Sequence, residues 1–197
     1  MFGEEYTLVA VSDYILKHNP GATVSNLSST RALRDVTESY NQKYTASAVG
    51  EVNVVTAMKE TDAVIGGEGN GGIIYPELHY GRDALVGIAL ILSHLAHKKC
   101  TISEIRDSYP AYCISKNKIQ LTPEINVDQI LFKMADKYSH EEVDTTDGVK
   151  IYIDKEWVHL RKSNTEPIIR IYSESKNETT ATELANRIIE EIKSLID

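Results

Sequence analysis

A short segment near the C-terminus gathers side chains that could hold an anion. Its polar residues are Arg161, Ser163, Asn164 and Thr165, followed five residues later by Arg170. Arginine presents a planar pair of donors, and the hydroxyl and amide groups add others, which together suit a tetrahedral phosphate dianion. Each charge-assisted hydrogen bond contributes roughly 1.5 to 3 kcal/mol. We therefore expect this segment to bind a phosphate without a metal.

One observation supports that expectation, and one alternative stays open. The whole chain carries a formal charge of -8, so a local group of cations is not part of a generally basic surface. The alternative is a hairpin in which Ser, Asn and Thr make only local turn bonds, as these residues commonly do.

A second polar group lies in a glycine-rich segment that follows the apolar run 63–65. Residues 66–72 read GGEGNGG, so Glu68 and Asn70 are the only side chains of the segment. Glycine lets a ligand approach the backbone closely, a carboxylate accepts hydrogen bonds from hydroxyls, and an amide both donates and accepts. We expect Glu68, Gly69 and Asn70 to bind sugar hydroxyls. The alternative is a flexible surface loop, and the spacing does not match the GxGxxG or GxxxxGK[ST] nucleotide motifs.

Together these segments resemble the sugar-binding and phosphate-binding loops of the α-D-phosphohexomutases, which include phosphoglucomutase, phosphomannomutase and phosphoglucosamine mutase. The resemblance rests on residues 66–77, 81–84 and 161–167 with Arg170, and it extends upstream to 29–33 and 49–51. It covers the third and fourth domains of the family. It implies that the first group binds the phosphate, that the glycine segment binds the sugar, and that Arg31, Glu51 and Arg82 are candidate secondary site residues.

The resemblance also implies that the reacting groups lie outside this chain. Family members carry a phosphorylated serine within Thr-Ala-Ser-His-Asn-Pro and a magnesium-binding loop of the Asp-Gly-Asp-Gly-Asp type, and neither motif occurs here. Residues 45–47 read TAS, but they lie in an alternating stretch that predicts a strand. Asp147 and Gly148 lie between two strand-like runs, as is typical of a hairpin turn. We expect no catalytic residue and no metal ligand in this chain.

The expected function is therefore that of half an enzyme. The intact protein would interconvert hexose 1-phosphate and hexose 6-phosphate through a bisphosphate intermediate, with Mg²⁺ held by a loop of the N-terminal half. That half and the hexose phosphate would be the partners of this chain, and the chain alone would be inactive. The alternatives are a stand-alone sugar-phosphate binding or regulatory module and a protein-interaction scaffold. The sugar stays open between glucose, mannose and glucosamine.

Composition sets broad limits. The chain has 197 residues, of which 42% are hydrophobic and 25% charged, as in ordinary globular proteins. No apolar run approaches the roughly 20 residues that span a bilayer, the start is acidic rather than signal-like, and the two cysteines lack metal-ligand spacing. We expect a cytoplasmic protein that binds neither membrane nor nucleic acid.

The hydrophobic periodicity predicts two domains. Over residues 1–115, predicted helices at 8–16, 30–36, 52–58 and 83–97 alternate with strands at 22–27, 44–49 and 63–65, which indicates an α/β domain with a mixed sheet. Over 116–197 we expect a small α+β domain with an antiparallel sheet. Its strands are 149–153, 157–161 and 168–172, its helices lie at 127–135 and 184–196, and an extended crossover at 112–121 precedes them.

Overall fold

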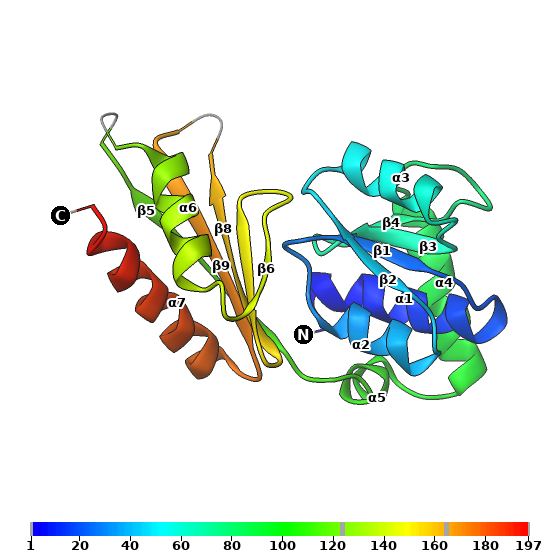
Figure 1. Ribbon diagram of the computed structural model, residues 1–197. Coiled ribbons are helices and arrows are strands. Elements are labelled where there is room, and N and C mark those ends of the chain that lie inside the picture. Colours follow the sequence, from blue (N-terminus) through cyan, green and yellow to red (C-terminus); the bar gives the residue numbers. More distant parts are fainter. Residues whose placement is uncertain (1, 123–124, 164–165, 197) are drawn as a thin grey trace. The chain divides into compact units, whose positions relative to one another are not determined.

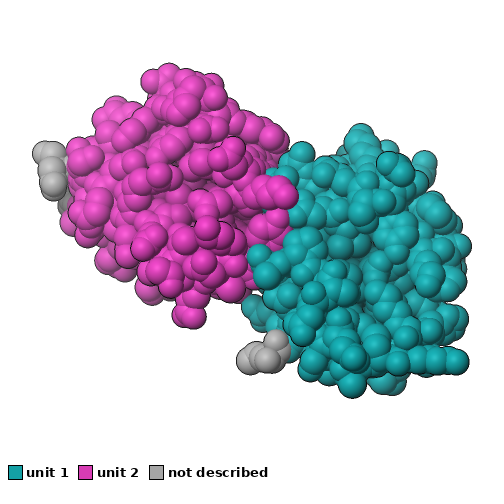
Figure 2. Space-filling model, turned by 90° about the horizontal axis from the view of Figure 1, so that it is seen from below, with its two compact units in different colours: residues 1–111 teal, residues 112–197 magenta. Residues whose placement is uncertain are grey.

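The chain folds into two compact units, residues 1–111 and 112–197, shown in teal and magenta in Figure 2. The computed structural model describes residues 2–122, 125–163 and 166–196. The division falls four residues before the expected boundary, because the segment that begins at Cys113 is a strand paired along its whole length with a strand of the second unit. None of the helices in the described part of the chain combines the length and apolarity that crossing a bilayer requires.

The first unit is an α/β layer structure (Figure 1). Its elements in chain order are α1 (Glu4–His18), β1 (Thr23–Asn26), α2 (Ala32–Ser39), β2 (Tyr44–Ser47), α3 (Glu51–Glu60), β3 (Ile65–Glu68), β4 (Gly72–Ile74), α4 (Ala84–Lys98) and α5 (Ile102–Asp107). The strand order is β2-β1-β3-β4, with β1 parallel to β2 and β3, and β4 antiparallel to β3. The predicted mixed sheet is confirmed.

Two glycines show how closely helices approach this sheet. A side chain at Gly66 would meet the sulfur of Met58 on α3, whereas one at Gly67 would meet Leu8 on α1 and the carbonyl of Gly72. Because successive strand residues point to opposite faces, α3 packs on one face of the sheet and α1 on the other. The glycines of β3 therefore serve packing and strand pairing.

The glycine-rich segment is a β-hairpin, not the continuous loop that the sequence suggested. Gly66 and Gly67 belong to β3, and Gly72 begins β4. The turn between the strands includes Gly71, whose φ of 85° lies in the region that glycine occupies readily. Glu68 consequently ends a buried strand, and only residues 69–71 form the turn. We refer to residues 65–74 as the glycine hairpin.

The second unit has a five-stranded antiparallel sheet and two long helices among its described residues. The antiparallel sheet and both helices were predicted, whereas the segment expected as an extended crossover is a strand of the sheet. Its elements are β5 (Cys113–Gln120), α6 (Val127–Lys137), β6 (Glu142–Asp144), β7 (Val149–Ile153), β8 (Glu156–Lys162), β9 (Ile168–Ser175) and α7 (Glu178–Lys193). The order is β5-β9-β8-β7-β6. The short edge strand β6 was not predicted, because three residues carry too little periodicity to be recognised.

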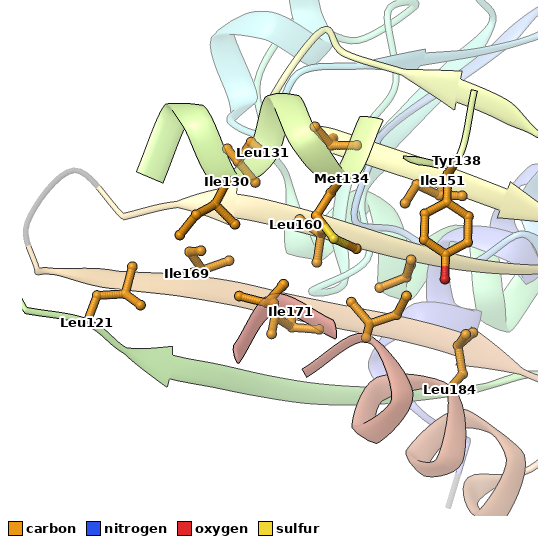
Figure 3. Packing of buried hydrophobic residues seen from close by; sticks show 14 residues of the cluster. Leu121, Ile130, Leu131, Met134, Tyr138, Ile151, Leu160, Ile169, Ile171 and Leu184 are labelled. Atoms are coloured by element: carbon orange, nitrogen blue, oxygen red, sulfur yellow. The ribbon is translucent and has the colours of Figure 1, made fainter. Parts of the chain in front are cut away.

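Both helices cover the same face of this sheet. Figure 3 shows Leu131 and Met134 of α6 and Leu184 of α7 packed around strand residues that include Leu160 and Ile171. All of them are at least nine-tenths buried. Strand residues that alternate with this set point to the opposite face, which the two helices leave uncovered.

Candidate functional site

Glu68 lies at the carboxyl end of β3, where ligands of α/β sheets commonly bind. Only 6% of the residue is exposed. Burial of a carboxylate is costly unless it is paired and hydrogen-bonded, and both oxygens of Glu68 have partners. Asn26 Nδ2 donates to Oε1 over 3.0 Å, and Arg82 Nη1 lies 3.4 Å from Oε2. The side chain is thus an anchored acceptor at a sheet edge.

Arg82 joins Glu68 to a second carboxylate. Its backbone N–H donates to Glu51 Oε1 over 3.0 Å, and its Nε donates to Glu51 Oε2 over 2.9 Å. The backbone N–H of Arg82 and then its guanidinium lower the pKa of Glu51 below its ordinary value. The guanidinium therefore lies between two carboxylates, and the structure brings together three of the residues proposed from the sequence.

The turn of the glycine hairpin presents backbone and amide groups. Asn70 is exposed, and its Oδ1 accepts from the backbone N–H of Gly72 over 3.1 Å. The backbone N–H of Gly69 donates to Ser29 Oγ over 2.9 Å. Asn70 therefore caps its own turn through one end of the amide, while the conformation of Gly69 is tied to the segment after β1.

Arg31 stands at the beginning of α2, one turn before Asp35. Its Nε lies 3.2 Å from Asp35 Oδ1. An i,i+4 pair of this kind on a helix surface contributes a few tenths of a kcal/mol. The contact holds the guanidinium against its own helix in this structure.

In the second unit, Arg161 on β8 and Arg170 on β9 are direct cross-strand partners. Residues opposite one another in an antiparallel pair project from the same face, and the neighbours Leu160 and Ile171 belong to the helix-covered core. The two arginines therefore share the face that the helices leave uncovered. We call Arg161 and Arg170 the arginine pair.

One carboxylate stands beside this pair. Arg161 Nε lies 2.9 Å from Asp147 Oδ2, and His159 Nε2 donates to the Asp147 backbone carbonyl over 2.7 Å. Burial, reinforced by the positive charges of Lys150 and Arg161, lowers the pKa of His159 to about 4 although the carbonyl contact opposes the shift. His159 is therefore neutral near pH 7, and the arginines supply the positive charge here.

The connection between β8 and β9 holds the rest of the proposed phosphate group. The backbone N–H of Ser163 donates to the Ile168 carbonyl over 3.1 Å, and Ser163 Oγ accepts from the N–H of Glu166 over 3.3 Å. These bonds close the base of a hairpin. Asn164 and Thr165, the remaining candidates, lie outside the described residues.

Two short motifs behave structurally as the sequence indicated. Ser47 ends strand β2 and donates its hydroxyl to the Ala48 carbonyl over 2.9 Å. Asp147 and Gly148 lie in the connection between β6 and β7, with Gly148 at φ 77°. Within residues 2–122, 125–163 and 166–196, no group of three or more His, Cys, Asp or Glu side chains is arranged to hold a metal ion.

Sequence reasoning missed the residues that hold the proposed ones in place. Asn26 was part of a predicted strand, and Asp147 was assigned only to a turn, yet one contacts Glu68 and the other Arg161. A signal for Asn26 exists in the pattern: it is a polar residue at the end of a buried strand predicted to lie in the same sheet as the strand before Glu68.

Comparison with known proteins gives a match in each of the two units. The family model for phosphoglucomutase/phosphomannomutase α/β/α domain III matches residues 3–112, and the model for the C-terminal domain of the same family matches residues 117–191. A solved structure of a phosphoglucomutase/phosphomannomutase family protein from Burkholderia thailandensis superimposes with a TM-score of 0.78 at 20% identity. The superposition covers 96% of this chain and 41% of the Burkholderia thailandensis chain.

Curated relatives are more similar in sequence. A phosphoglucosamine/phosphogalactosamine mutase of Sulfurisphaera tokodaii is 35% identical over 88% of this chain, and a phosphoglucomutase/phosphomannomutase of Thermococcus kodakarensis is 36% identical over 94%. The chain spans only 38% and 41% of these two relatives. On the strength of the two matched domains, the chain belongs to the phosphoglucomutase/phosphomannomutase family, of which it comprises domain III and the C-terminal domain.

Proposed function

We propose that this chain is the sugar-phosphate-binding half of a phosphohexomutase, which interconverts hexose 1-phosphate and hexose 6-phosphate through a bisphosphate intermediate. The observation that carries the proposal is the presence of one polar cluster in each matched domain. Glu51, Arg82 and Glu68 form the first cluster, and the arginine pair beside the β8–β9 connection forms the second.

Glu68 would recognise the sugar. A carboxylate has about four lone-pair directions, and the contacts with Asn26 and Arg82 engage one direction on each oxygen. The remaining directions can accept from two neighbouring hydroxyls of a hexose. Because vicinal hydroxyls occur in either orientation of the ring, the same carboxylate can hold a sugar phosphate presented by either end.

The arginine pair would hold the phosphate that is not reacting. Two guanidinium groups on adjacent strands offer donors to different oxygens of one phosphate, at roughly 1.5 to 3 kcal/mol for each charge-assisted bond. Ser163 at the base of the connection adds a hydroxyl. We include Asn164 and Thr165 in this set from the sequence. The role of this chain is then to position the substrate, which accelerates a transfer without any proton being moved by these residues.

The phosphoryl donor and Mg²⁺ belong, in this proposal, to domains outside this chain. The residues described here do not fit a magnesium site, because Asp147 faces a guanidinium rather than further carboxylates. Mg²⁺ requires several oxygen ligands in octahedral geometry. A cytoplasmic location is part of the same proposal. The second candidate, a stand-alone binding or regulatory module, would use the same two clusters without chemistry.

Titration followed by NMR tests the binding. Glucose 6-phosphate should shift amide signals at 68–70 in the first unit and at 161–170 in the second, whereas inorganic phosphate should shift only the second set. A chain that shows neither response up to about 10 mM ligand, where even millimolar affinities are visible, refutes the proposal.

Two further observations separate the half-enzyme from the stand-alone module. A coupled mutase assay on the isolated chain should show no turnover, and turnover proportional to its concentration would mean that it contains its own phosphoryl donor. An open reading frame that continues upstream of Met1 into a domain with a phosphorylatable serine would support the half-enzyme. A stop codon directly upstream would support the module.

A further inference from the structure

Asn26 is a buried residue whose side-chain amide connects the glycine hairpin to the segment that follows β1. It ends β1, and only 5% of it is exposed. Its Nδ2 donates to Glu68 Oε1 over 3.0 Å. Its Oδ1 accepts from the backbone N–H of Ser28 and from Ser29 Oγ, both over 3.0 Å. All polar atoms of the carboxamide therefore have a partner.

These partners determine which way the amide points. The backbone N–H of Ser28 can only donate, so the atom that faces it must be the carbonyl oxygen of Asn26. The NH₂ group must then face Glu68, which as a carboxylate can only accept. The side-chain N–H of Asn26 is thus directed at Glu68, because the backbone N–H of Ser28 can donate a hydrogen bond but cannot accept one.

A second connection runs from the same segment to the next residue of the hairpin. Ser29 Oγ donates to Asn26 Oδ1 and accepts from the backbone N–H of Gly69 over 2.9 Å. A further carboxylate, that of Glu5 on α1, accepts from the backbone N–H of Thr30 over 2.9 Å. The side chain of Glu68 and the backbone of Gly69 are therefore both tied to residues 26–30.

We propose that Asn26 is a positioning residue for hexose recognition. Its N–H fixes the carboxylate of Glu68 in the orientation that leaves the remaining lone pairs for sugar hydroxyls, before any ligand binds. This role rests on the proposed function of Glu68 as a sugar-binding residue. Preorganisation of this kind improves affinity because the ligand does not have to order the carboxylate on binding.

The replacement Asn26→Asp isolates the contact. The new side chain has the same shape, and one of its oxygens can still accept from Ser28 and Ser29. The other oxygen would face Glu68 Oε1, so a donor–acceptor contact becomes a contact of two acceptors. The neighbouring charged groups are Arg82, which contacts Glu68, and Glu5 beside Gly69. Only the first of these can offset the added negative charge.

The experiment compares two probes on the 197-residue chain, glucose 6-phosphate and inorganic phosphate. Asn26→Asp should weaken glucose 6-phosphate binding by about tenfold, the loss expected for one charge-assisted contact, and leave the affinity for inorganic phosphate within about twofold. The matched control is Asn53→Asp, which adds the same charge at an exposed position of α3. It should change neither affinity.

A double substitution separates positioning from folding. In Asn26→Asp/Glu68→Gln the donor and acceptor exchange places, so the contact can form again. Asn26→Asp should lower the melting temperature because two acceptors then face one another, and the double substitution should restore it. Glucose 6-phosphate affinity should stay low in the double variant because the carboxylate that accepts from the hydroxyls is gone. A double variant whose melting temperature stays as low as that of Asn26→Asp would mean that the two side chains are not directly coupled, which overturns the inference.

The remaining outcomes are distinguishable. If the wild-type chain binds glucose 6-phosphate and Asn26→Asp binds it equally well, or loses both probes to the same extent, the role of Asn26 is refuted and the proposed function stands. If the wild-type chain binds neither probe, the proposed function itself fails, and the role of Asn26 in it fails too.

Discussion

Arg161 and Arg170 face one another across two adjacent strands, on the sheet face opposite to α6 and α7. Like charges directly opposite in an antiparallel pair are destabilising, and the carboxylate of Asp147 beside Arg161 offsets only part of that repulsion. A doubly charged anion bound to both guanidinium groups would remove the cost. If the arginine pair binds phosphate as we propose, ligand binding should stabilise the second unit.

This link predicts opposite effects of one substitution. Arg170→Thr should raise the melting temperature of the ligand-free chain, because the repulsion is relieved and threonine favours strands. It should also weaken inorganic phosphate binding by about tenfold. Thermal unfolding with and without phosphate measures both effects. Lys155→Thr, at an exposed position between β7 and β8, is the control and should change neither. A variant with lower stability and unchanged affinity would contradict the prediction.

Glu68→Gln should reduce sugar recognition without loosening the hairpin. The amide oxygen can still accept from Asn26 Nδ2, so the fold should be retained. The amide has fewer acceptor directions than the carboxylate and no charge, so glucose 6-phosphate affinity should fall about tenfold. Calorimetric titration provides the measurement. Equal affinity in the variant would remove Glu68 from the sugar site.

His159 should make the chain less stable in mild acid. Its pKa is about 4 in the folded state, against an ordinary value of 6.5. Between these two pH values the unfolded chain binds a proton at this position and the folded chain does not. Falling pH therefore favours unfolding, by about 3 kcal/mol over the full interval.

The substitution His159→Gln tests this expectation. Denaturant unfolding at pH 7 and pH 4.5 should show a smaller difference in unfolding free energy for the variant than for the wild type. The comparison cancels the other titrating groups, because they are common to both chains. Identical pH dependence in the two proteins would show that His159 is not the group responsible.

Asp13 should be a polar position on which the stability of the first unit depends. Burial alone would raise its pKa, but the hydrogen bonds that its carboxylate accepts outweigh burial and hold the pKa well below its ordinary value. Its partners are His94, Tyr40, Tyr109 and Lys98. They come from three segments: Tyr40 ends α2, His94 and Lys98 lie on α4, and Tyr109 follows α5. The carboxylate of Asp13 therefore connects α1 to all three.

Asp13→Ala should therefore lower the free energy of unfolding by roughly 3 kcal/mol, because buried hydroxyl and imidazole groups lose their partner. Urea unfolding measured by circular dichroism gives the value. Asp107→Ala, at an exposed position of α5, should cost less than about 0.5 kcal/mol. Comparable losses in both variants would mean that the network contributes nothing beyond an ordinary surface charge.

Sequence periodicity recovered most of the architecture, and the exceptions have physical reasons. The long helix α4 was predicted from the helical spacing of its apolar residues, and β7 and β8 from their alternation. The position of α4 was wrong in one respect, because Leu85, Ile88 and Leu92 are exposed and only Gly87 and His94 are buried. The hairpin formed by β3 and β4 was missed because glycines carry no side chain and therefore no periodic signal. Its strands are defined by backbone pairing, which composition does not report.

For the candidate site too, the sequence predicted one part and only the structure showed the other. Residue type and order along the chain were enough to single out Glu68 and the arginine pair, because carboxylates and guanidinium groups have chemistry that is local to each residue. The resemblance of the motifs to a known family indicated the family and added Arg82. The contacts Asn26–Glu68, Glu51–Arg82 and Asp147–Arg161 join residues that are 42, 31 and 14 positions apart. Only the tertiary structure decided those pairings, because which side chains meet depends on strand order and register rather than on the identity of any one residue.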